Sequence, residues 1–205
     1  MTKTMSTKAT DELRSIRDDV VQCTQCDLHK SRTNPVVGSG AHEADILFIG
    51  EAPGEEEDKK ALPFVGAAGK VLDKMLKHIG LERDDVYIAN TIKCRPPGNA
   101  DPTEEQKNEC LSYLTRQIEA IDPKVVVCMG NHATKSIFNL FGLEKKLEPI
   151  SKIHGKLFQA DPIMFPNGVK VMPVYHPAAM LHNPPLAQEL RKDFKKLKAA
   201  IGVKP

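Results

Sequence analysis

The sequence has no apolar run long enough to cross a bilayer, which excludes an integral membrane protein. Its first residues, MTKTMSTKATDELRSIRDD, have no apolar core like that of a secretory signal. They also carry acids that transit peptides avoid. We therefore expect an intracellular protein, cytoplasmic or nucleoid-associated, whose thiols stay reduced.

Internal repeats, low-complexity segments and linkers rich in proline, glycine or serine are also lacking. The 205 residues, 40% of them hydrophobic, suffice for one substantial core, so we expect a single domain over residues 1–205 and a monomer. The net charge is only +2, which permits a nucleic-acid partner without requiring one.

The common phosphate-binding loops are missing. The segment GEAPGEEEDKKALPFVGAAGK, residues 50–70, is not closed by GK[ST] and does not contain GxGxxG. Its four consecutive acids at positions 55–58 would repel a phosphate. We therefore expect an active-site loop that faces a base, a sugar or a water, with a solvated acidic turn as the alternative.

Four of the five cysteines have a spacing typical of metal ligands. Cys23 and Cys26 form a CxxC pair, and Cys94 and Cys110 follow far downstream. In a reducing compartment such thiols favour a metal over disulfides, and four donors complete a tetrahedral set. The wide second spacing favours a [4Fe–4S] cluster over zinc. A thioredoxin-type pair and unrelated structural cysteines remain alternatives, and Cys128 is expected in the core.

Strand and helix signals alternate along the chain. Apolar runs predict buried strands at 45–50, 86–90, 124–130 and 169–176, and a hairpin at 155–170 around Pro166 to Gly168. Periodic stripes predict helices at 11–21, 66–79, 101–121, 131–141 and near the C-terminus, with Asp101 as the N-cap of the third. This order predicts an α/β fold with a parallel sheet covered on both faces.

Polar residues follow each predicted strand. GEAPG follows the first strand, Asn90 ends the second, GNHA follows the third and His176 follows the fourth. Because ligands of such folds bind beyond the carboxyl ends of parallel strands, we expect these residues to share one site.

The C-terminal LRKDFKKLKAAIGVKP is the densest basic run. Leu190, Phe194, Leu197 and Ile201 recur at helical spacing, which predicts a helix packed on the body with a cationic outer face. That face is either solvated or in contact with phosphate.

Five motifs occur together in one order, namely GEAPGEEED, LPFVGAAGKVLDKML, NTIKCRPP, VVVCMG and VYHPAAML. In this combination the chain resembles the iron–sulfur uracil-DNA glycosylases of family 4, the thermophile and archaeal type, from Cys23 to the C-terminal helix. The resemblance implies a three-layer αβα fold with a central four-stranded parallel sheet. It also implies a [4Fe–4S] cluster on Cys23, Cys26, Cys94 and Cys110.

The same resemblance implies a monofunctional hydrolase of base excision repair. Its substrate would be uracil-containing DNA, single- or double-stranded, from which it releases uracil and leaves an abasic site. Phe64 would stack on the flipped uracil, Asn90 would read its edge, and His176 would contact O2 and stabilise the departing anion. The full set expected around uracil is Glu51, Ala52, Pro53, Phe64, Asn90 and His176.

The residue that directs the attacking water is less closely defined. Relatives outside this family carry an aspartate where this chain has Ala52, so Glu51 and Glu57 are the candidate catalytic acids. Glu57 could instead shape the site against the thymine methyl group. In the loop from Pro177 to Pro184, Met180 or Leu181 would fill the gap that the flipped base leaves in DNA.

Two other functions stay open at this stage. One is a non-catalytic iron–sulfur protein that binds nucleic acid, although such a protein has no need for polar residues at three strand ends. The other is a glycosylase that also removes further deaminated bases.

Overall fold

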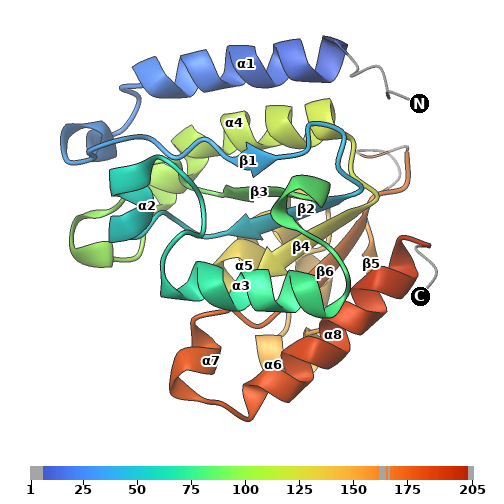
Figure 1. The fold of residues 1–205 in the computed structure, drawn as a ribbon. Helices are drawn as coiled ribbons and strands as arrows, with labels where there is room; N and C mark the ends of the chain where they lie inside the picture. The colour runs from blue at the N-terminus through green and yellow to red at the C-terminus, as the bar shows by residue number, and fades with distance from the viewer. Residues whose placement is uncertain (1–6, 162–164, 166, 203–205) are drawn as a thin grey trace.

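A computed structural model describes residues 7–161, 165 and 167–202 (Figure 1). Its helices are α1 (Thr7–Gln22), α2 (Glu55–Lys60), α3 (Ala67–His78), α4 (Glu104–Ile121), α5 (Asn131–Leu140), α6 (Ile150–Ile153), α7 (Ala179–His182) and α8 (Leu186–Ala200). Its strands are β1 (Ser39–Gly40), β2 (Ile46–Gly50), β3 (Tyr87–Asn90), β4 (Val125–Met129), β5 (Phe158–Gln159) and β6 (Lys170–Val174). None of these helices is both long and apolar enough to span a membrane.

The strands of the described residues form one sheet in the order β1-β3-β2-β4-β6-β5. The four central strands are parallel, which confirms the predicted four-stranded parallel sheet. The two-residue strands β1 and β5 add antiparallel edges. The β5–β6 pairing confirms the predicted hairpin, although Pro166 in its turn lies outside the described residues.

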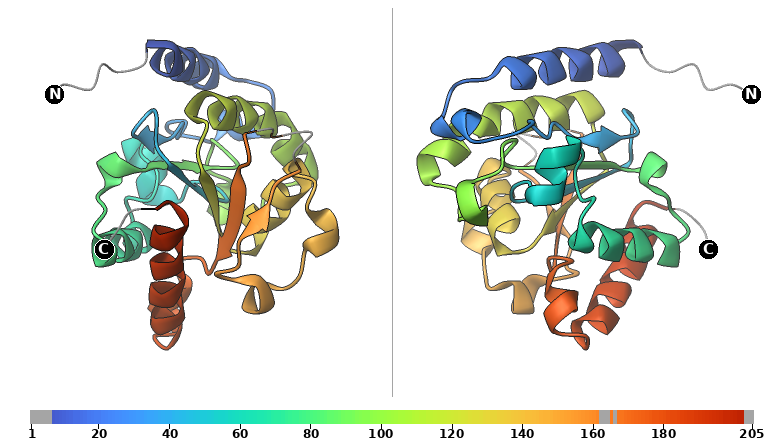
Figure 2. Two further views of the ribbon diagram at one scale, coloured as in Figure 1. Left: turned by 90° about the vertical axis from the view of Figure 1, so that its right-hand side faces the viewer. Right: turned by 60° about the vertical axis from the view of Figure 1, so that its left-hand side comes forward.

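Alternate residues of each central strand enter different cores. Leu47 and Ile49 of β2 pack with α1, α4 and α5 on one face. Ile46 and Phe48 pack with α3 and α8 on the other. Period-two alternation in a strand that is buried throughout is expected when helices cover both faces of a parallel sheet. Figure 1 and both views of Figure 2 show α1 and α4 on one side and α3 and α8 on the other.

Two predicted boundaries were wrong, and both errors bear on the site. The N-cap of α4 is Thr103, which forms a capping box with Gln106, so Asp101 is not the cap. Asp101 lies before the helix, and its carboxylate is near Glu51. The acidic part of GEAPGEEED is not a loop, because Glu55–Lys60 forms α2. The four acids occupy the first turn of that helix, where the helix dipole favours negative charge.

The C-terminal helix matches its prediction. Leu190, Phe194 and Leu197 are buried against the sheet and α3. Its exposed residues include Arg191, Lys192, Lys195 and Lys196. The same helix also carries Asp193, which is 1% exposed and accepts a 2.7 Å hydrogen bond from His154 Nδ1.

Candidate active site and cysteine-lined cavity

The carboxyl ends of the parallel strands bring the predicted polar residues to one edge of the sheet. Gly50 is opposite Asn90 in the β2–β3 register, and the Gly130 amide after β4 donates to the Val174 carbonyl at the end of β6. Glu51 therefore begins beside the end of β3, and His176 lies two residues beyond β6. Helix α2 marks this edge in Figure 1 and comes forward in the right-hand view of Figure 2.

Asn90 is a buried amide with an unmatched acceptor. It is 1% exposed, and its Oδ1 has no hydrogen-bond partner among the described residues. A buried acceptor in that state costs about 1–3 kcal/mol, which a ligand donor would offset. Gly50 makes room for it, since a Cβ there would lie 2.4 Å from Asn90 Oδ1 and 2.6 Å from Phe64 Cζ. Both side chains therefore converge over one glycine.

Phe64 is held in an unfavourable backbone conformation. Its φ is 53°, a left-handed value that costs an L-residue about 1–2 kcal/mol. Arg83 stabilises this turn by donating to the carbonyls of Pro63, at 3.0 Å, and Phe64. Asp73 orients that guanidinium through a 2.6 Å contact. The Phe64 ring centre lies 5.8 Å from that of His176, with 38° between their planes.

The hydrogen bonding of His176 defines its tautomer. Its Nδ1 lies 3.1 Å from the Ala178 amide nitrogen, which is a donor, so Nδ1 accepts and the neutral ring carries its proton on Nε2. Burial lowers the pKa of His176, and the nearby charge of Glu57 opposes this shift in part. The ring is therefore neutral at neutral pH, and no acceptor for Nε2–H lies among the described residues.

Glu57 and Glu51, the two acids expected near the reacting atoms, have different surroundings. Glu57 Oε1 accepts hydrogen bonds from the amides of Val65, at 2.9 Å, and Gly66, at 2.8 Å. Glu57 thus fixes the turn that follows Phe64. Glu51 Oε1, in contrast, is buried and accepts no hydrogen bond from a described residue.

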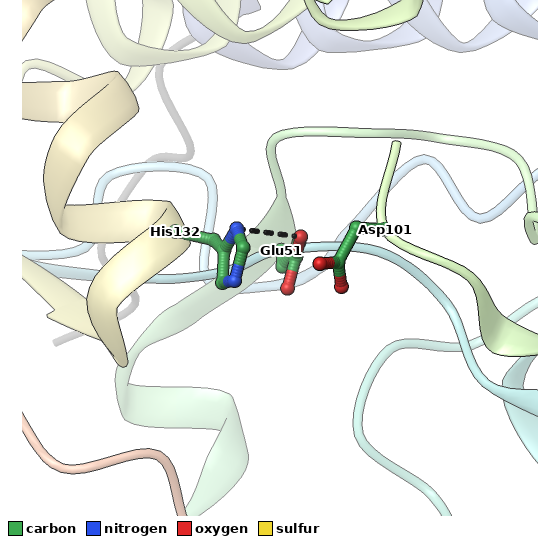
Figure 3. A group of neighbouring side chains, drawn as sticks. All are labelled: Glu51, Asp101 and His132. Carbon is green, nitrogen blue, oxygen red and sulfur yellow. Dashed lines mark ion pairs between the residues drawn. The ribbon is translucent and has the colours of Figure 1, made fainter. Parts of the chain in front are cut away.

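Glu51 belongs to a cluster with His132 and Asp101 (Figure 3). One ligand atom from each lies within 4.8 Å of the others, and His132 Nδ1 is 3.2 Å from Glu51 Oε1. Burial raises the pKa of Glu51, the charge of His132 lowers it, and that of Asp101 raises it further. Beside this cluster runs a groove lined by α4 and α5, with Lys107 and Lys135 among its residues.

The remaining predicted residues differ in exposure. Ala52 is partly buried and Pro53 is buried, both between β2 and α2. Met180 is 8% exposed and packs in the core between the sheet, α3 and α8, whereas Leu181 is 48% exposed. Of the two candidate wedge residues, only Leu181 presents its side chain to solvent.

The four predicted ligand cysteines line one small cavity, formed by the segment after α1, the loop after β3 and α4. Arg32 donates to Cys94 Sγ at 3.0 Å, and the Lys93 amide donates to Cys110 Sγ at 3.3 Å. Burial raises the pKa of Cys110 to about 11, so a metal must displace its proton. Cys128 is buried in β4, as predicted.

Lys93 connects the cavity with Asn90. Its side chain is buried, and its Nζ donates to the Asn90 carbonyl at 2.8 Å and to Gln117 Oε1 at 2.5 Å. Desolvation lowers the pKa of Lys93 to about 8. The backbone that presents Asn90 is therefore fixed from the side of the cysteines.

Several residues at this edge could not be found from sequence patterns. Arg83 acts on Phe64 from 19 positions away and Lys93 is a buried cation, and no local pattern signals either role. The position of His132 at this edge could have been predicted, because GNHA follows a predicted strand.

The fold and this edge define an α/β protein with a site built from the loops after parallel strands. Residues 37–200 match the model of the "Uracil DNA glycosylase superfamily". The type-4 uracil-DNA glycosylase of Archaeoglobus fulgidus is 50% identical over 194 residues, covering 95% of this chain and 96% of that protein. Those of Saccharolobus solfataricus and Thermotoga maritima are 46% and 43% identical, covering 95% and 91% of this chain and 89% and 93% of theirs. The chain belongs to the uracil-DNA glycosylase superfamily and, within it, to the type-4 group.

Proposed function

We propose that this chain hydrolyses the N-glycosidic bond of deoxyuridine in DNA, releasing uracil and leaving an abasic site for base excision repair. The observation that carries the proposal is the buried Asn90 Oδ1, which has no partner among the described residues. Uracil N3–H would supply the missing donor, while the Asn90 amide group donates to O4. Cytosine offers an acceptor at N3 and a donor at position 4, so the same amide would reject it.

Uracil would reach Asn90 only after the nucleotide flips out of the helix. Phe64 would then stack on the base, in the turn that Arg83 and Glu57 hold. Pro53 and Ala52 would complete the surface around the base. The exposed Leu181 would enter the gap left in a duplex, since apolar side chains are the usual wedge for an unstacked step.

His176 would contribute most to lowering the activation barrier of bond cleavage. Uracil leaves as an anion whose charge develops at O2, and a neutral Nε2–H aimed there stabilises charge that exists only in the transition state. Nδ1 accepts a hydrogen bond from the Ala178 amide, which supports this orientation of the ring. The lowered pKa of His176 supports a neutral donor throughout turnover.

Glu51 is the better candidate for directing the water. Its Oε1 accepts no hydrogen bond from the described residues, whereas Glu57 Oε1 already accepts two from backbone amides. Ala52 offers no acceptor on its side chain. Glu57 therefore serves to shape the site, and Glu51 serves as the acid that orients or deprotonates water.

We further propose that Cys23, Cys26, Cys94 and Cys110 hold a [4Fe–4S] cluster. A tetrahedral zinc with bonds of about 2.3 Å would bring its sulfurs to about 3.8 Å of one another. In the described part of the chain, no three cysteine sulfurs lie within 4.8 Å of one another. The wider set favours a cluster, and the donors Arg32 and the Lys93 amide suit thiolate sulfur. When bound, the cluster supplies a cross-link and no redox step.

The chain would act as a single domain, because one sheet carries both hydrophobic cores. We propose that it is a monomer. The test of the function uses three oligonucleotides that differ at one position, carrying uracil, thymine or cytosine. After incubation, alkali cleaves any abasic site. We expect cleavage of the uracil strand alone, from single- and double-stranded DNA. If the uracil strand stays intact under all conditions, the proposal fails. Cleavage of the thymine strand as well would show a broader specificity.

A further inference from the structure

The backbone of Glu51 is held by hydrogen bonds, and its side chain makes one ion-pair contact among the described residues. Its carbonyl accepts hydrogen bonds from the Ile92 amide at 2.9 Å and from Thr91 Oγ1 at 2.7 Å. Its side chain is 25% exposed, and the buried Oε1 makes no hydrogen bond within the described residues. A group that directs water needs a defined orientation, so whatever restrains this carboxylate matters for the rate.

The neighbour in reach is His132, in the first turn of α5. Its Nδ1 lies 3.2 Å from Glu51 Oε1, close enough for an ion pair when the ring is protonated (Figure 3). The contact does not use the lone pair of Oε1 in a directional hydrogen bond, because that atom has no such partner among the residues that the structure describes. Restraint by charge thus leaves the oxygen able to accept from a water.

We propose that His132 is a positioning residue that holds the Glu51 carboxylate where it directs the attacking water. This inference rests on the proposed function and extends it to a residue that does not touch the substrate. Asp101 lies near the same carboxylate, and its charge is opposite to that of protonated His132. The two neighbours therefore have opposite electrostatic effects on Glu51.

Three charged groups among the described residues act on Glu51, and each has its own effect on the pKa of the carboxyl group. His132 comes from α5, Asp101 from the loop before α4, and Lys107 from α4. Lys107 also pairs with Glu104 at 3.0 Å, which weakens its effect. Burial raises the pKa of Glu51, His132 and Lys107 lower it, and Asp101 raises it. The carboxylate acts in its ionised form, so the rate should rise with pH through this pKa.

The test measures single-turnover uracil release between pH 4.5 and 9 for His132→Gln and Asp101→Asn. Loss of the His132 charge should move the acidic limb of the profile to higher pH. Loss of the Asp101 charge should move it to lower pH. Each shift should be about 0.2–0.7 of a pH unit, the size expected for a partly exposed ion pair. At a pH where the wild-type His132 ring is protonated, the rate of His132→Gln should also be lower than that of the wild type, by about tenfold at most.

His78→Gln is the matched control, because it makes the same chemical change on the exposed last turn of α3. Its profile should superimpose on that of the wild type. Shifts in the same direction for His132→Gln and Asp101→Asn, or no shift in either, would overturn the inference. A wild type that releases no uracil at any pH would instead overturn the proposed function.

A second readout does not depend on activity. The carboxyl carbon of Glu51 can be titrated by NMR in the wild type and in both variants. We expect the same two opposite shifts, and coincident titration curves would contradict the inference even where a variant is too unstable for kinetics.

Discussion

The cysteine-lined cavity and the carboxyl edge of the sheet lie a few residues apart in sequence yet differ in how their polar atoms are satisfied. Around the cavity, Arg32 and the Lys93 amide donate to sulfur, and Lys93 Nζ has two acceptors. At the edge, Asn90 Oδ1 and Glu51 Oε1 are buried without hydrogen bonds among the described residues, and Phe64 has a left-handed φ. The polar atoms of the first region are thus satisfied within the protein, and we propose that the second region retains unmatched atoms for a substrate.

The largest expected effect separates stability from rate at the cavity. Cys110→Ala should lose bound iron and lower Tm by about 6–20 °C, because a loss of about 3–5 kcal/mol lowers Tm by roughly 2–4 °C per kcal/mol in a chain of this size. Uracil release by the folded fraction at low temperature should stay within about tenfold of the wild type. Iron content, Tm and rate are measured on one preparation.

Cys128→Ala is the control for that experiment, since Cys128 is buried in β4 away from the cavity. It should keep its iron. A Cys110→Ala protein with full iron content and unchanged Tm would remove the assignment of Cys110 as a ligand.

The next largest effect is expected at the carboxyl edge of the sheet, where the rate should change and the stability should not. His176→Ala should lower kcat by about 10²- to 10³-fold, the usual loss for one donor to a developing anion. Tm should change little, because the ring's hydrogen bond among the described residues stays within its own turn. Kinetics and calorimetry report the two quantities, and a His176→Ala enzyme with full kcat would show that the leaving group is stabilised elsewhere.

A smaller effect distinguishes two neighbouring residues of α7. Leu181→Ala should slow uracil release from duplex DNA by about tenfold and leave single-stranded DNA unaffected, because only a duplex has a stack to fill. Met180→Ala should instead lower stability by about 2–5 kcal/mol, since Met180 is buried. Equal losses on both forms of DNA for Leu181→Ala would argue against a wedge.

The smallest effect concerns the support of the Phe64 turn. Arg83→Ala removes the donors to the carbonyls of Pro63 and Phe64. KM for uracil-containing DNA should rise about three- to tenfold, equal to roughly 0.6–1.4 kcal/mol, with kcat less affected. Lys74→Ala, an exposed cation on α3, is the control and should leave KM unchanged. An unchanged KM in Arg83→Ala would mean that Glu57 alone maintains the turn.

The sequence predicted the parallel sheet and its ligand edge because both depend on local signals. Buried strands have continuous apolar runs, and the carboxyl ends of parallel strands must share one edge. The position of Asp101 was predicted less well, since Asp101–Pro102 and Thr103–Gln106 both look like helix starts and only hydrogen bonding decides between them. Contacts such as Arg83 to Phe64 and His132 to Glu51 depend on how separate elements pack, which periodicity does not encode.

The central claim is that the edge leaves Asn90 unmatched in order to bind uracil, and Asn90→Leu tests it most directly. Leucine has a similar shape but no polar atoms, so the variant removes the buried acceptor without opening a cavity. Uracil release and Tm should be measured on the same sample, against the wild type. The account predicts a loss of at least about 10²-fold in rate with an equal or higher Tm. Full activity, or a lower Tm with activity retained, would contradict it.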